Sequence, residues 1–185
     1  CYFGGGTRIV LELGEYRESL DVDFLCADQD GYRALRNAVT NQSLGDIFSH
    51  PPTLLREVRA DMYGIRTFVE IDSQPVKFEI VREARIPIAG TNISSLPVPC
   101  LDHATCVAEK LLANTDRGLD RSTRSRDLID LAFMAGSWSD EEISQGLELA
   151  EAAYGASVLK LLASTIDLFD NDYKKQCLTE LEVRN

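Results

Sequence analysis

Two aspartates separated by a single residue are the first candidates for chemistry in this sequence. Asp21 and Asp23 alternate with Leu20, Val22 and Phe24 in a pattern typical of a β-strand, which places both carboxylates on one face. Such carboxylates repel each other and are costly to desolvate unless a cation compensates them. Mg²⁺ would do so, because one or two carboxylates plus a substrate phosphate typically hold it. An edge strand with a solvated face explains the same pattern without a metal.

A run of glycines near the start of the chain is the second candidate. Residues 4–6 precede Thr7 and lie before apolar residues at helical spacing, Ile9, Val10 and Leu13. We therefore expect a strand, a glycine turn and a short helix, whose first backbone N–H groups could hold a phosphate. No Gly-Lys-Ser/Thr follows, so the run is not a Walker loop. A tight turn without a ligand is the alternative.

A third carboxylate is expected from a hairpin further along the chain. Residues 72–75 are typical of a turn between two strands, and the second strand alternates so that Glu79 and Lys77 share a face. Glu70 and Asp72, on the other side of the hairpin, compete with Glu79 for the same role.

These residues lie in a β-rich half that precedes an all-helical half. The pattern predicts an α+β protein with a small mixed β-sheet core in residues 1–99 and a helical bundle in residues 100–185. Residues 86–100, with three prolines, are expected to connect the halves without regular structure. The predicted helices cover residues 31–39, 104–112, 128–133, a segment that begins at Asp140, and 158–168.

Composition limits the classes of function. A chain of 185 residues, with 44% hydrophobic and 26% charged residues, predicts one folded domain, alone or with an appendage. Its formal charge of −11 means that a local basic patch must meet any polyanion. No apolar stretch is long enough to cross a membrane. The scattered cysteines predict free thiols and a cytoplasmic location; they are Cys1, Cys26, Cys100, Cys106 and Cys177.

Cys100, His103 and Cys106 offer only three ligands, in a spacing unlike that of structural zinc sites. We therefore expect no zinc there. Trp138 is expected in the core. The chain lacks an initiator Met and begins within an apparent core strand, so we expect further residues before Cys1.

Several motifs, in this order, resemble a known family. They are Gly4-Gly5-Gly6-Thr7, Ser19-Leu20-Asp21-Val22-Asp23-Phe24, Glu109-Lys110-Leu111-Leu112-Ala113, Arg117, and Arg126-Asp127-Leu128-Ile129-Asp130-Leu131. The pattern is similar to that of the AbiEii/AbiGii toxin family of bacterial nucleotidyltransferases, which have the polymerase-β-like fold. The resemblance implies a Mg²⁺- or Mn²⁺-dependent enzyme that moves a nucleoside monophosphate from an NTP such as ATP or GTP to an acceptor hydroxyl.

The resemblance also implies roles for individual residues. Asp21, Asp23 and Glu79 would be catalytic and bind the metal. The nucleotide would be bound by Gly5, Gly6, Thr7, Ser19, Lys110, Asp127 and Asp130. Without the resemblance, Lys110 and the helix that carries both aspartates would be interpreted as a solvated, salt-bridged surface.

The acceptor and partners follow less directly. RNA, and tRNA in particular, is favoured, with a basic run of Arg117, Arg121, Arg124 and Arg126 as the contact. An antitoxin protein is a further expected partner. The alternatives are a catalytically inactive nucleotide-binding or protein-interaction module of the same fold, and a subunit that needs a preceding segment or a second chain.

Overall fold

The computed structural model describes residues 1–184, which form two compact units. The sheet unit contains residues 1–7 and 20–100, and the helical unit contains residues 8–19 and the chain from Leu101 onward. Residues 8–19 therefore group with helices that are distant in sequence. Among the described residues, no helix is both long and apolar enough to span a bilayer.

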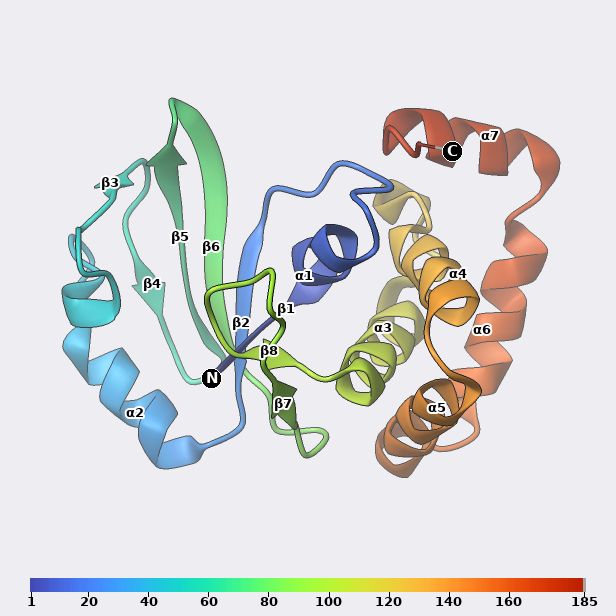
Figure 1. Ribbon diagram of the computed structural model, residues 1–185, viewed down its shortest axis with the longest axis horizontal. Helices are drawn as coiled ribbons and strands as arrows, with labels where there is room; N and C mark the ends of the chain where they lie inside the picture. The colour runs from blue at the N-terminus through green and yellow to red at the C-terminus, as the bar shows by residue number, and fades with distance from the viewer. Residues whose placement is uncertain (185) are drawn as a thin grey trace. The chain divides into compact units, whose positions relative to one another are not determined.

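The sheet unit is built on one mixed β-sheet (Figure 1). Its strands are β1 (Tyr2–Gly4), β2 (Val22–Cys26), β3 (Thr53–Leu54), β4 (Arg59–Ala60), β5 (Gly64–Ile71), β6 (Gln74–Arg82), β7 (Gly90–Thr91) and β8 (Cys100–Leu101). They follow the order β3-β5-β6-β2-β1-β8-β7, and β4 pairs with β5. β2 pairs in parallel with β6 and antiparallel with β1, so the sheet is mixed as the sequence predicted.

The central hairpin joins β5 to β6 through the expected turn. Asp72 and Ser73 have φ angles of 49° and 62°, the left-handed pair that a two-residue turn of type I′ requires. Along β6, Phe78 and Ile80 are buried, whereas Glu79 between them is half-buried on the other face. The hairpin turn fixes this alternation, because a shift of one residue would turn the apolar side chains out.

The apolar face of the sheet is covered by α2 (Gln29–Ala38), with the short 3-10 helix η1 (Gly45–Ile47) after it. Asp28 caps α2 by accepting hydrogen bonds from the backbone N–H groups of Asp30 and Gly31. Tyr32 of α2 lies in the core with Ile65, Phe78 and other buried residues of the sheet. This packing buries one face of β6 and leaves the other face for polar side chains.

The helical unit contains five helices after the sheet. They are α3 (His103–Arg117), α4 (Arg126–Ser137), α5 (Asp140–Tyr154), α6 (Ser157–Leu168) and α7 (Asn171–Glu180), with the 3-10 helix η2 (Arg121–Thr123) before α4. The helical unit also includes most of α1 (Gly5–Glu12), whose first residues belong to the sheet unit. Ser139 and Glu142 form a capping box at the start of α5, where the acidic run predicted a helix.

Four details differ from the sequence-based expectations. β2 begins at Val22, because its pairing with β6 begins there, and Leu20 is 54% exposed. The connector ends in a paired strand, since Cys100 aligns with Phe3. Trp138 is only half-buried and stacks on His103, with ring centroids 4.0 Å apart. α7 was not expected, because its sequence has little apolar periodicity.

Candidate active site

The glycine turn lies directly against the Asp23 carboxylate. β1 ends at Gly4, which aligns with Asp23 of β2, and α1 begins at Gly5. Gly5 has a φ of +69°, and a Cβ atom there would lie 2.3 Å from Asp23 Oδ2. A side chain at Gly5 is therefore excluded twice, by backbone strain and by the approach of the carboxylate. The two features that the sequence singled out separately meet at one place.

The start of α1 gives this place its second property. The first N–H groups of an α-helix, here from Gly5, Gly6 and Thr7, have no acceptor within the helix and carry partial positive charge. An anionic group is therefore favoured beside them. The site thus combines a place for phosphate oxygens with a carboxylate a few ångströms away.

Glu79 lies next to Asp23 on the neighbouring strand. The two residues are aligned in the parallel pairing of β2 with β6, and aligned residues of paired strands share a face. Asp21 precedes β2 and is half-buried. Glu70 and Asp72 lie at the turn end of the hairpin and are exposed, so the alignment selects Glu79 among the three competing carboxylates.

Two basic side chains already contact Glu79. Arg66 Nε donates to one carboxylate oxygen at 3.2 Å, and the Lys77 ammonium group contacts the other oxygen. Arg66 also forms an ion pair with Asp61 at 3.4 Å. The charge of Glu79 is therefore balanced by neighbours on its own hairpin, whereas no ion pair of Asp21 is found within residues 1–184.

The donor set fits a magnesium ion in part. Within residues 1–184, no three His, Cys, Asp or Glu side chains are gathered as a metal-binding group. Mg²⁺ is commonly held by only one or two carboxylates, with phosphate and water completing its shell. Asp23 supplies oxygens of this kind next to the glycine turn, and Asp21, two residues earlier, stays a predicted second ligand. Glu79 could join them only by sharing or releasing Arg66 and Lys77, so its role as a ligand stays a prediction.

A second group of predicted site residues lies inside the helical unit. Lys110 Nζ contacts Asp127 Oδ1 at 3.0 Å and Asp130 Oδ2 at 2.6 Å. Arg17 binds both oxygens of Asp130, at 2.7 and 2.9 Å, and Arg117 Nε donates to Asp127 at 2.7 Å. We call these five residues the buried ion network, because Asp127, Asp130, Lys110 and Arg17 are all at most 7% exposed.

Burial and charge act in opposite directions in this network. Burial alone would raise the pKa of each carboxyl, but Lys110, with Arg117 at Asp127 and Arg17 at Asp130, outweighs it and holds both pKa values below their usual range. Tyr16 donates to Asp130 at 2.6 Å, and burial together with that carboxylate raises the pKa of its hydroxyl. Both aspartates are therefore ionised at neutral pH.

The sequence left two interpretations of this second group, a nucleotide-binding role and a solvated, salt-bridged helix surface. The residues form ion pairs, as a salt-bridged helix surface would, but the pairs are buried. Sequence analysis missed Tyr16 and Arg17, and no signal pointed to them, because Arg17 and Asp130 are 113 residues apart. The contacts of Lys110, Asp127 and Asp130 with a nucleotide stay predictions, as does that of the half-buried Ser19.

The arginines predicted to contact RNA mostly have partners in the chain. Arg117 binds Asp127, the Arg121 guanidinium lies 4.6 Å from the Tyr173 ring centroid, and Arg124 forms an ion pair with Glu180. Arg126, at the start of α4, is half-buried. Their interaction with RNA stays a prediction.

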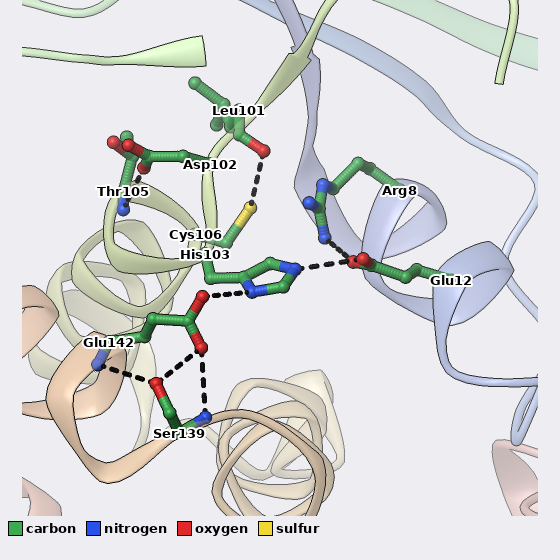
Figure 2. Close-up of polar contacts among 9 residues, drawn as sticks. All are labelled: Arg8, Glu12, Leu101, Asp102, His103, Thr105, Cys106, Ser139 and Glu142. Carbon is green, nitrogen blue, oxygen red and sulfur yellow. Dashed lines mark hydrogen bonds and ion pairs between the residues drawn. The ribbon is translucent and has the colours of Figure 1, made fainter. Parts of the chain in front are cut away.

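A further polar cluster involves His103 (Figure 2). Its two ring nitrogens lie 2.9 Å from Glu12 Oε1 and 2.7 Å from Glu142 Oε1, and Glu12 is also bound by the buried Arg8. Cys106 points instead to the Leu101 carbonyl, and burial raises the pKa of its thiol to about 12. The polar contacts of the cluster link α1, α3 and α5, which indicates a structural role.

The chain is similar to known proteins in sequence and in fold. The family described as nucleotidyl transferase AbiEii toxin, type IV TA system, matches residues 1–178. The fold is similar to that of an antigenic nucleotidyltransferase-like protein from Paracoccidioides brasiliensis, with a TM-score of 0.50 and 15% identity over 99% of this chain and 84% of that one. A putative nucleotidyltransferase from H. pylori is 18% identical over 90% of this chain and 88% of its own, with a TM-score of 0.38. No curated protein matches the chain.

The match extends over almost all of the chain and includes the glycine turn, the strand aspartates and the buried ion network. It confirms the family and the α+β fold class that the motifs indicated. The chain belongs to the AbiEii family of nucleotidyltransferase toxins from type IV toxin–antitoxin systems, which implies an NTP as substrate and an antitoxin as partner.

Proposed function

We propose that this nucleotidyltransferase moves a nucleoside monophosphate from an NTP to a hydroxyl group of RNA, with Mg²⁺ or Mn²⁺ bound in the sheet unit. One observation carries the proposal: the Asp23 carboxylate lies against Gly5, at the N-terminus of α1. A phosphate held by the helix start would lie beside a carboxylate that can hold its counter-ion.

The residues of the site have separate tasks in this reaction. The backbone N–H groups at the start of α1 hold the triphosphate, and Asp23 with Asp21 would hold the metal. When bound, the metal supplies positive charge that stabilises the triphosphate during in-line attack. The acceptor oxygen forms a bond to the α-phosphorus, and the bond to the bridging oxygen breaks, so that pyrophosphate leaves. Glu79 would accept the proton of the attacking hydroxyl once Lys77 or Arg66 shares its carboxylate.

RNA is the proposed acceptor, and tRNA the first one to test. A nucleotide-binding module without turnover is the competing possibility, because Arg66 and Lys77 engage the carboxylate that would act as base. The two possibilities differ in whether label moves from the NTP to the acceptor.

A transfer assay with labelled NTPs, Mg²⁺ and total tRNA tests the proposal. We expect label in the RNA with the native chain and none with Asp23→Asn. Asp46→Asn is the matched control, because Asp46 is an exposed carboxylate of the same unit outside the site. Glu79→Gln should reduce transfer more than Glu70→Gln. Binding of the NTP in calorimetry without transfer to any RNA would favour the inactive module.

A further inference from the structure

A basic hollow lies on the sheet unit, away from the glycine turn. It encloses about 150 Å³ and is lined by Gln29, Tyr32, Arg33, Arg36, Met62 and Arg82. Since a water molecule occupies about 30 Å³ of liquid, the hollow has room for a phosphate group. Three of its six lining residues are arginines, in a chain whose formal net charge is −11. Positive charge is thus concentrated at this hollow, although the chain as a whole carries a net negative charge.

Two of these arginines have no anionic partner among residues 1–184. Arg33 forms an exposed ion pair with Asp30 at 3.1 Å. Arg36 and Arg82 are half-buried, and neither guanidinium forms an ion pair or hydrogen bond with any residue in the described part of the chain. Arg36 is in the last turn of α2, where a cation is favoured, but no helix end accounts for Arg82. Two partly desolvated cations at one hollow favour an anion between them.

The wall of the hollow is held in place by hydrogen bonds. The Tyr32 hydroxyl donates to the Asp61 carbonyl at 2.7 Å, and the Arg82 N–H donates to the Tyr63 carbonyl at 2.9 Å. The Asp61 carboxylate accepts from the backbone N–H groups of Tyr63 and Gly64, so it is engaged by its own loop. The loop 61–64 is thereby fixed against the arginines.

Two exposed apolar side chains belong to this loop: Met62 lines the hollow, and Tyr63 follows it in the chain. Tyr63 is 67% exposed and Met62 is 55% exposed, although both belong to this fixed loop. Proteins that bind single-stranded RNA combine cationic contacts to phosphates with aromatic side chains on which bases stack. Tyr63 offers an exposed ring of this kind in the loop that also contributes Met62 to the hollow.

We propose that this hollow binds the phosphodiester backbone of single-stranded RNA, with Tyr63 stacking on an adjacent base. Arg36 and Arg82 contact the phosphate, and Arg33 widens the positive surface. The inference rests on the proposed function, because it assigns a binding site to the acceptor. Arg82 follows Glu79 by three residues on β6, so the two lie about 10 Å apart along the strand and on opposite faces. The hollow can be altered without touching the acids.

Binding of a labelled RNA, followed by fluorescence anisotropy, tests this site in an Asp23→Asn background that removes turnover. The probes are a single-stranded oligonucleotide and a duplex of equal length. Arg36→Gln/Arg82→Gln should weaken single-strand binding at least tenfold. The slope of log K against log salt should fall by about 0.7, since the two arginines neutralise one phosphate and each neutralised phosphate of a single strand contributes about 0.7. Lys160→Gln/Lys174→Gln removes the same charge from the helical unit and should change binding less than twofold.

Two further variants separate RNA from a small anion. Tyr63→Ala should weaken single-strand binding about tenfold and leave duplex binding unchanged. Arg82→Lys, which keeps the charge, should retain more binding than Arg82→Gln, and thermal melting verifies that each variant is folded. No effect of Tyr63→Ala, together with full competition by millimolar inorganic phosphate, would overturn the assignment to RNA.

Equal binding by the arginine and lysine double variants would overturn the site altogether. Such a result, with transfer by the native chain intact, would leave the proposed function standing. The reverse result, arginine-dependent RNA binding by a chain that transfers no label, would refute the proposed function and leave this site standing.

Discussion

Two pairs of carboxylates in this chain have opposite surroundings. Asp23 and Glu79 lie on neighbouring strands, half-buried, next to a glycine turn and a helix start. Asp127 and Asp130 lie on one face of α4, buried and bound by Lys110 and two arginines. Asp23 lies against a helix start suited to phosphate, and Glu79 binds two partly exposed cations, whereas the cations around the second pair are mostly buried.

The difference shows why similar residues do different work. A buried carboxylate with matched cations contributes to a defined fold, and removing one partner leaves charges that water cannot reach. A half-buried carboxylate can exchange water for a metal or a substrate. We therefore expect substitutions in the buried ion network to affect stability first, and substitutions at the strand pair to affect activity first.

The largest expected effect is at Asp130. Asp130→Ala leaves Arg17 and Lys110 buried without their shared anion and should lower the free energy of unfolding by about 3–5 kcal/mol. For a domain of this size, the melting temperature should fall by about 10 °C. Asp23→Ala, measured alongside by calorimetry, should shift it by less than about 3 °C. Equal shifts in melting temperature for the two variants would contradict the proposed difference between the two pairs.

The next effect concerns the glycine turn. Gly5→Ala places a methyl group 2.3 Å from Asp23 Oδ2 at a φ of +69°, so the turn or the carboxylate must move. A displacement of about 1 Å in a reacting site costs about 100-fold in rate, and we expect a loss of that size in the transfer assay. Gly136→Ala, in α4, meets no atom within 4 Å and should leave transfer unchanged.

The elements at the strand pair could largely be predicted from the sequence. The alternation around Asp23, the turn at residues 72–75 and the glycines before Thr7 are local patterns, and each dictates its own backbone. The alignment of Asp23 with Glu79 could not be derived, because strand pairing between distant segments depends on the whole sheet.

The buried ion network was less predictable for the same reason. Asp127 and Asp130 share a helix face by spacing alone, but Arg17 binds Asp130 from 113 residues away, and His103 binds Glu12 from 91 residues away. Such contacts depend on how helices pack. The basic hollow could not be predicted from the sequence either, because α2, loop 61–64 and the end of β6 contribute to it from three separate segments.

The buried ion network should make the stability of the chain depend on pH in the acid range. The pKa values of Asp127 and Asp130 are lowered in the folded chain, mainly by Lys110 against the opposing effect of burial. Their contribution to stability is therefore complete above the unfolded pKa near 4 and is lost as the pH falls through the folded values. Melting between pH 7 and pH 2.5 should show a steep loss on the acid side. Asp130→Asn, if folded, should flatten that loss.

The smallest expected effect is at the His103 cluster, where His103, Glu12 and Glu142 are all partly exposed. Ser139→Ala removes the cap of α5 and a hydrogen bond to Glu142, whose pKa is lowered chiefly by its bonds with Ser139. The loss of such a cap costs about 1 kcal/mol, or about 3 °C in melting temperature. The rate of transfer should be unchanged, because the contacts of this cluster hold helices together. A loss of transfer at unchanged stability would instead place His103 and its carboxylates in the chemistry and remove the contrast with the strand pair.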